Sequence, residues 1–255
     1  MEVKNLVFAY DKRGPKILDG VSFTIPRGKI TTFMGANGSG KSTLFQLMTK
    51  NLVPGRGKVM CDGKNIQMIG YKEFARIAAI VHQNNTASSD ITVERLVSYG
   101  RTPYLSVLGT MRKEDDEIVD WAMEVMEVGQ YRERSVMDLS GGQRQRVWIA
   151  MALAQKTDIL FLDEPTTYLD IRYQLELLEK IRQLNQELGI TVVMVLHDIN
   201  HAIYYSDRVI GLKNGHVEIC GEPEEVITSE SIHSLYGIHL DVIELEGKKI
   251  VLNVS

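Results

Sequence analysis

The chain has 255 residues, of which 44% are hydrophobic, and its formal net charge is −4. Such a chain can bury a sizeable core, and we expect a single compact unit. A slightly negative chain lacks the basic excess that neutralises phosphates, so nucleic acid is not an expected partner. No apolar run approaches the ~18 residues of a bilayer span, and the first residues do not resemble a signal peptide, so we expect a soluble, cytoplasmic protein.

The first recognisable elements surround a glycine-rich segment. Residues 21–25 alternate apolar and polar side chains, residues 26–29 form a turn, and residues 30–34 read as a returning strand, which predicts a hairpin. Residues 44–48 have apolar side chains at helical spacing. The segment at residues 35–43 therefore lies between a strand and a helix.

This glycine-rich segment fits the pattern G-x-x-x-x-G-K-[ST] of a phosphate-binding loop. Its residues are Gly35, Ala36, Asn37, Gly38, Ser39, Gly40, Lys41, Ser42 and Thr43. Glycines let several backbone N–H groups point inward, and the N-terminus of the following helix attracts phosphate oxygens. Lys41 is predicted to neutralise the terminal phosphates, and the Ser42 hydroxyl to ligate Mg²⁺. The alternative is a glycine turn that carries a lysine by chance.

The remainder of the chain predicts an α/β fold. Charged helical stretches replace strands over residues 84–140, which indicates a helical insertion. A β-α-β unit, and hence a parallel sheet, is predicted between residues 158 and 196. It consists of a short apolar strand at residues 158–163, an amphipathic helix and a buried strand at residues 190–196. The helix carries Leu177, Ile181, Leu184 and Leu188 on one stripe. The tail from residue 222 predicts two short strands at residues 241–245 and 249–254, with no chemistry assigned.

Polar side chains follow three of these apolar strands. Asp163 and Glu164 end the strand at residues 158–163, where ligands of open parallel sheets bind. Adjacent side chains on a strand point opposite ways, so we assign Asp163 to Mg²⁺ and Glu164 to the attacking water. His197 follows the next strand and can contact the γ-phosphate, unless it is a core histidine. Gln83, after the strand at residues 77–82, can reach the metal or the water, or is simply a turn residue.

A second glycine-rich segment precedes a predicted helix. It consists of Ser140, Gly141, Gly142 and Gln143. A serine and glycine N–H groups at a helix N-terminus suit a phosphate, although a serine-capped helix after a turn explains the same residues. Two half-sites on one chain suggest a symmetric dimer in which the partner closes over each nucleotide.

In this order, the motifs make almost the whole chain resemble the ATP-binding subunit of ATP-binding-cassette transporters. The resemblance implies a RecA-like P-loop NTPase core (residues 1–83 and 141–221), a small antiparallel β subdomain, a helical subdomain (residues 84–140) and a C-terminal extension (residues 222–255). It also implies that Asp170 communicates across a homodimer and that Tyr10 stacks on adenine.

Four segments resemble the sequences of the subfamily that powers import of iron–siderophore complexes, haem or cobalamin. These segments are residues 140–155, 163–170, 99–103 and 195–200. The resemblance implies Mg²⁺-dependent ATP hydrolysis, integral-membrane permease partners, an extracytoplasmic binding protein and a position on the inner face of the cell membrane. Another transported cargo, a soluble ATP-driven switch of the same superfamily and a nucleotide kinase remain as alternatives.

Overall fold

The computed structural model describes residues 1–11, 13–106, 110–245 and 247–252. The chain forms two compact units, which we call unit 1 (Met1–Ile69 with Thr191–Ser255) and unit 2 (Gly70–Ile190). The sequence-based boundaries at residues 83/84 and 140/141 differ from the limits of these units, since unit 2 also contains residues 70–83 and 141–190. Among the described residues, no helix is both long and apolar enough to span a bilayer.

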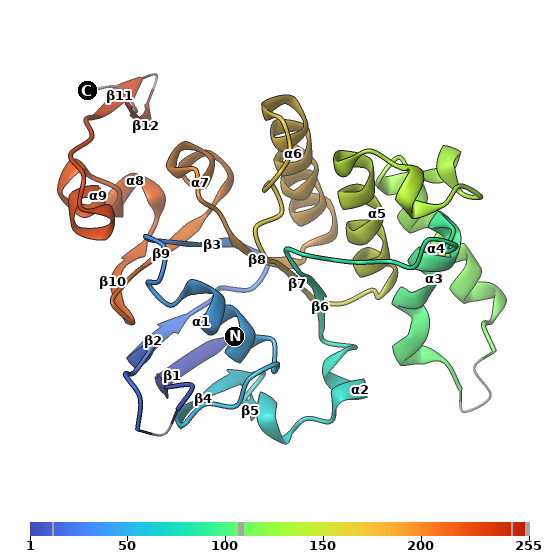
Figure 1. Ribbon diagram of the computed structural model, residues 1–255, viewed down its shortest axis with the longest axis horizontal. Coiled ribbons are helices and arrows are strands. Elements are labelled where there is room, and N and C mark those ends of the chain that lie inside the picture. Colours follow the sequence, from blue (N-terminus) through green and yellow to red (C-terminus); the bar gives the residue numbers. More distant parts are fainter. Residues whose placement is uncertain (12, 107–109, 246, 253–255) are drawn as a thin grey trace. The chain divides into compact units, whose positions relative to one another are not determined.

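Unit 1 contains a four-stranded antiparallel sheet near the N-terminus (Figure 1). Its order is β2 (Leu18–Thr24), β1 (Glu2–Phe8), β4 (Arg56–Cys61) and β5 (Lys64–Asn65). Val3 of β1 pairs with Phe23 on one side and Val59 on the other, and all three are buried. This sheet is the predicted antiparallel β subdomain.

A second group of strands in unit 1 carries the parallel part of the fold. β3 (Ile30–Met34) pairs in parallel with β8 (Thr191–Val195) and with β9 (Arg208–Lys213), and β10 (His216–Gly221) is antiparallel to β9. The predicted hairpin of residues 21–34 is wrong, since β2 and β3 belong to different sheets. All five residues of β3 are buried, as expected of an interior parallel strand rather than a half-exposed hairpin strand.

The C-terminal extension packs on this sheet rather than trailing from it. Its elements are α8 (Pro223–Val226), α9 (Ser229–Tyr236), β11 (Val242–Leu245) and β12 (Lys248–Val251), and they gather near α7 (Ile199–Tyr205), β9 and β10 (Figure 1). Both predicted tail strands are present, but the second runs from Lys248 to Val251 rather than over residues 249–254, of which 253 and 254 lie outside the described residues. The other helices of unit 1 are α1 (Lys41–Met48) and the 3-10 turn η1 (Ile66–Met68).

Unit 2 combines two parallel strands with a helical group. β6 (Ala78–Val81) pairs in parallel with β7 (Ile159–Leu162). Its α-helices are α2 (Tyr71–Phe74), α3 (Val93–Ser98), α4 (Lys113–Val125), α5 (Gly141–Ala154) and α6 (Ile171–Leu188). Its 3-10 turns are η2 (Tyr99–Tyr104), η3 (Gly129–Tyr131) and η4 (Val136–Asp138). The predicted helical insertion at residues 84–140 contains α3 and α4, which pack on each other and on α5, a helix that the sequence assigned to the core. Leu177, Ile181 and Leu184 are buried as predicted, but Leu188 is 42% exposed.

A buried ion pair joins the helical elements of unit 2. The Arg101 Nε atom donates to Asp115 Oδ1 at 2.8 Å, and Arg101 Nη1 donates to the Ala154 carbonyl at 2.8 Å. Both charged side chains are less than 10% exposed. Burial alone would raise the pKa of Asp115, but hydrogen bonds from the Arg112 N–H and from Arg101, with the charges of both arginines, hold this pKa below its ordinary value.

Replacement of Asp115 by alanine is expected to lower the free energy of unfolding by about 3–5 kcal/mol at pH 7, because the Arg101 charge stays buried without its carboxylate. Urea denaturation measures this change. The stabilisation is complete above the unfolded-state pKa of Asp115 and is lost as the pH falls through the lower folded-state pKa, so parent and variant should converge in acid. Glu117→Ala is the control, since Glu117 faces a 91% exposed Lys113 at 3.8 Å and should change stability by less than ~0.5 kcal/mol.

Candidate functional site

The glycine-rich loop of unit 1 has a backbone that only glycine adopts without strain. Gly35, Gly38 and Gly40 have φ angles of 133°, 78° and 107°. A Cβ atom on Gly35 would lie 2.3 Å from the carbonyl oxygen of Leu212, and one on Gly40 would lie 2.7 Å from a methyl of Leu18. The loop therefore depends on glycine both for its dihedral angles and for its close approach to neighbouring elements.

Two polar side chains inside this loop fit an anionic ligand. Lys41 is 5% exposed, and its Nζ atom donates to the carbonyls of Gly35 at 2.8 Å and Ala36 at 3.0 Å. The buried Ser39 Oγ atom has no hydrogen-bond partner among the residues that the structure describes. A buried hydroxyl without a partner is costly, and an ammonium held against carbonyls can turn to a stronger acceptor. Both features suit the oxygens of a phosphate.

The structure brings Tyr10 to the end of the same loop. Its hydroxyl lies 3.2 Å from Thr43 Oγ1, and the ring is held edge-on against Phe8 with centroids 5.0 Å apart. The side chain is nevertheless 66% exposed. Tyr10 is therefore positioned by its hydroxyl and one edge rather than by burial, and most of its ring remains accessible. Ser42, predicted to bind Mg²⁺, is also exposed.

His197 leaves the sheet at the same edge as the loop. Val195 of β8 pairs in parallel with Phe33 of β3, and His197 and Gly35 each follow two residues later. The imidazole is exposed, so the alternative of a buried core histidine is wrong. Within unit 1, the sheet thus places the predicted phosphate-sensing histidine beside the strand that leads into the phosphate loop.

The acid pair lies in unit 2 at the end of β7. Leu162 pairs with Val81 of β6, and the Asp163 N–H continues this ladder by donating to the Val81 carbonyl at 2.9 Å. Gln83 Nε2 donates to Glu164 Oε2, and Thr167 Oγ1 lies 3.1 Å from the same oxygen. The structure thus brings Gln83 and Glu164 together, and Gln83 is more than a turn residue.

Glu164 has a strained backbone. Its φ is 49°, in the left-handed region that a glutamate seldom occupies and that costs about 1–3 kcal/mol. Such strain persists where neighbouring contacts enforce it, and here Gln83 and Thr167 both hold the carboxylate. Thr167 was not predicted from the sequence, although it lies in the residue 163–170 segment that carries the family resemblance.

Ser140 and Gln143 form a reciprocal helix cap. The Ser140 Oγ atom accepts from the Gln143 N–H at 3.3 Å, and the Ser140 N–H donates to Gln143 Oε1 at 3.0 Å. The serine-capped helix is therefore confirmed as a local role. Gly142 is buried, and a Cβ atom added there would lie 3.2 Å from the Tyr173 ring, whereas one on Gly141 would meet no described atom within 4 Å. Internal packing explains Gly142 but not Gly141.

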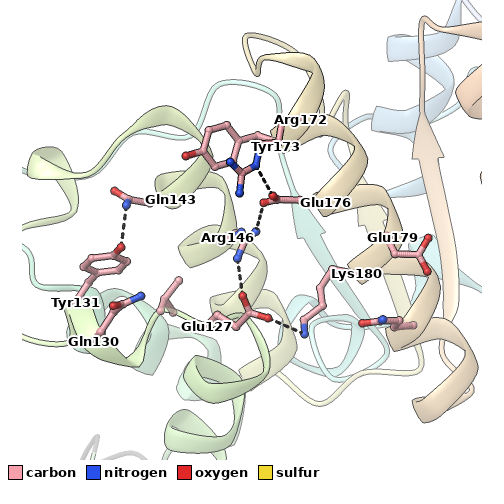
Figure 2. A pocket seen from close by; sticks show the side chains of 12 residues that line it. Glu127, Gln130, Tyr131, Gln143, Arg146, Arg172, Tyr173, Glu176, Glu179 and Lys180 are labelled. Carbon is pink, nitrogen blue, oxygen red and sulfur yellow. Dashed lines mark hydrogen bonds and ion pairs between the residues drawn. The ribbon is translucent and has the colours of Figure 1, made fainter.

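A charged network connects this helix to α6 across a groove of about 500 Å³ (Figure 2). Arg146 of α5 donates to Glu127 at 2.9 Å and to Glu176 of α6 at 2.8 Å, and Lys180 of α6 lies 3.3 Å from Glu127. Asp170 caps α6 by accepting from the Tyr173 N–H at 3.1 Å. The N-termini of α5 and α6, which carry Ser140 and Asp170, are therefore held in one framework within unit 2.

Comparisons with known proteins identify the relatives of this chain. A family model described as ABC transporter matches residues 18–167. The petrobactin import ATP-binding protein FpuC of Bacillus anthracis is 43% identical over 96% of this chain and 89% of its own length. The iron(3+)-hydroxamate import ATP-binding protein FhuC of Bacillus subtilis is 45% identical, and the ferric enterobactin transport ATP-binding protein FepC of Escherichia coli is 43% identical, each over 89% of this chain and 84% of its own length.

Solved structures agree with this relationship. A metal-chelate type ABC transporter in an inward-facing conformation has a TM-score of 0.85 at 25% identity, with 98% of this chain and 94% of the other covered. A dimeric ATP-binding cassette in a post-hydrolysis state, bound to ADP and Pi, has a TM-score of 0.75 at 29% identity, with 87% of this chain and 98% of the other covered. The P-loop NTPase fold predicted from the sequence is confirmed.

Proposed function

The chain belongs to the ABC transporter family of ATP-binding proteins, and we propose that it is the ATP-hydrolysing subunit of an importer for an iron–siderophore complex, haem or cobalamin. The observation that carries the catalytic part of this proposal is the strained Glu164, whose carboxylate is held by Gln83 and Thr167. The relatives are named as ATP-binding proteins for petrobactin import, iron(3+)-hydroxamate import and ferric enterobactin transport, and these names favour an iron–siderophore cargo.

In the proposed mechanism, unit 1 binds the nucleotide. Tyr10 stacks on adenine, the N–H groups of residues 35–43 surround the phosphates, and Lys41 exchanges its two loop carbonyls for phosphate oxygens. The orphaned Ser39 hydroxyl gains an acceptor in the same step. His197 reports through a hydrogen bond whether the γ-phosphate is present.

The proposal includes Mg²⁺, because hydroxyl, carboxylate and amide oxygens are the ligands that this ion prefers. Ser42, Asp163 and Gln83 would hold it together with the phosphates. When bound, Mg²⁺ neutralises charge on the phosphate oxygens and so favours attack by water. Among the described residues, no three His, Cys, Asp or Glu side chains gather as a metal site.

Glu164 acts as the general base in this proposal. Its carboxylate orients the attacking water and accepts its proton, while Gln83 and Thr167 hold the carboxylate through contacts to its Oε2 oxygen. The strained backbone at Glu164 fixes the direction in which its side chain leaves the end of β7.

Replacement of Glu164 by glutamine is expected to leave ATP affinity within about twofold of the parent and to slow hydrolysis at least ~100-fold, because the amide keeps the shape but cannot accept the proton. Nucleotide titration and phosphate release measure the two quantities. Lys41→Ala is the matched comparison, since it should weaken binding itself. Parental turnover in Glu164→Gln would show that another group is the base.

We further propose a homodimer in which residues 140–143 of one copy contact the nucleotide bound by the other, with Asp170 communicating between the two sites. Gly141 supports this arrangement, because it is exposed and the open space around it gives no internal reason for glycine. The dimeric state of the solved cassette bound to ADP and Pi is consistent with it.

Replacement of Gly141 by alanine is expected to keep the free energy of unfolding within about 1 kcal/mol, since alanine suits a helix and meets nothing in the monomer. Hydrolysis should fall at least ~10-fold, because the added methyl group occupies the space proposed for the partner's nucleotide. Denaturation and steady-state ATPase assays separate the two effects. Unchanged hydrolysis would rule out a close contact at this residue.

A permease partner is proposed for a groove of about 430 Å³ in unit 2. It is lined in part by residues 83–87, Trp148 of α5, and the exposed Tyr168. Gln83 thus has a place both beside Glu164 and in the wall of this groove, so a protein that docks there can influence the catalytic carboxylate. This role places the chain at the inner face of the cell membrane, with an extracytoplasmic binding protein delivering cargo to the permease.

Cells that lack this chain are expected to lose ATP-dependent uptake of at least one ferric siderophore, and the Glu164→Gln form should not restore it. Uptake of radiolabelled iron supplied as ferric petrobactin, a ferric hydroxamate or ferric enterobactin is the measurement. The parental chain supplied in trans is the control. Normal uptake of all three, with haem and cobalamin also transported, would refute the proposed cargo while leaving ATP hydrolysis unaffected.

A further inference from the structure

The C-terminal extension contacts the phosphate loop through one hydroxyl group. Tyr236 is the last residue of α9, and its Oη atom accepts a hydrogen bond from the Gly35 N–H at 3.1 Å, across 201 residues of sequence. Gly35 is the first residue of the loop, directly after β3. A side chain from the end of the chain therefore holds the point at which the loop leaves the sheet.

Tyr236 is itself fixed by the packing of α9. Leu235, the preceding residue, lies against Gly211 of β9, where an added Cβ would be 2.8 Å from a leucine methyl. Ile232 of α9 is buried in one core cluster with Met34, the residue before Gly35, and Tyr236 packs against that cluster. The helix ends at Gly237 with a left-handed cap, so Tyr236 occupies a defined final turn.

Gly35 is held through both of its backbone polar groups. Its N–H donates to Tyr236, and its carbonyl accepts from Lys41 at 2.8 Å. The other end of the loop is held where the Gly215 N–H donates to the Ser39 carbonyl at 3.1 Å. The Tyr236 contact to the Gly35 N–H does not involve Lys41, so it does not depend on whether the Lys41 ammonium stays on the Gly35 carbonyl.

The chemistry of Tyr236 suits this role. Burial raises the pKa of Tyr236, and the negative charge of Asp198 adds to this effect against the opposing hydrogen bond from Gly35, so the phenol stays neutral at physiological pH. Asp198 caps α7 and directly follows His197.

The C-terminal extension also holds α7, since Asn200 donates to the Val251 carbonyl at 3.0 Å and accepts from the Val251 N–H at 2.8 Å.

We propose that Tyr236 is a positioning residue for nucleotide binding, through which the C-terminal extension keeps the start of the phosphate loop in its binding geometry. This inference rests on the proposed function, because it assumes that the loop binds Mg-ATP. The inference assigns a role in nucleotide binding to the C-terminal extension, residues 222–252.

Replacement of Tyr236 by phenylalanine tests the inference, because it removes one oxygen and leaves the Gly35 N–H without its acceptor. The dissociation constants of Mg-ATP and Mg-ADP are expected to rise roughly three- to tenfold. The KM for ATP should rise in proportion, and kcat should change less than about twofold. The full-length protein is titrated with each nucleotide, and its thermal midpoint is measured without nucleotide.

Tyr204→Phe is the matched control, since it deletes the same hydroxyl from a 46% exposed tyrosine whose ring lies 3.9 Å from Lys248 Nζ. It should leave both dissociation constants unchanged. A Tyr236→Phe variant that melts earlier but binds both nucleotides like the parent would overturn the inference and reduce Tyr236 to a stability role. A parental protein without affinity for Mg-ATP would instead overturn the proposed function, so the two failures are distinct.

Discussion

The burial of β3 is the constraint on which the phosphate loop of unit 1 depends. All five of its residues are buried, and its neighbours β8 and β9 both run parallel to it. Because the strand cannot shift without disturbing both ladders, the direction in which Gly35 leaves the sheet is set by the core. The left-handed glycines then form a loop that is tight enough to exclude a Cβ atom at Gly35 and at Gly40. Hydrophobic packing thus determines where a set of polar groups points.

In unit 2, paired strands and side-chain contacts likewise fix the direction in which the functional residues leave the sheet. The β6–β7 ladder extends through the Asp163 N–H, and immediately beyond it the chain turns into the left-handed conformation of Glu164. An unfavourable backbone angle at one residue is tolerated because the paired strands before it and the Gln83 and Thr167 contacts around it leave few alternatives. Each unit therefore holds its own functional residues by internal contacts.

Sequence patterns predicted the parts of this site that are local. The phosphate loop, the acid pair and the capped glycine segment each occupy fewer than ten consecutive residues, and their identity follows from residue type and spacing. The partners of each strand were harder to predict from the sequence. Because β2 and β3 are adjacent in the chain, a hairpin was predicted, whereas the buried β3 pairs with parallel strands from residues beyond 190. The Tyr236–Gly35 bond could not be predicted, because no local pattern links two residues 201 positions apart.

The glycines distinguish internal from external requirements. At Gly35, Gly40, Gly57 and Gly215, a positive φ coincides with a neighbouring atom less than 3.0 Å from any added Cβ, so the fold alone explains the residue. Gly141 differs on both counts, because its surroundings are open and its φ is not in the left-handed region. A helix would gain from alanine there, so folding of the monomer disfavours glycine. The homodimer proposed above would supply such a requirement, because the partner's nucleotide would lie close enough to residue 141 for a single methyl group to matter.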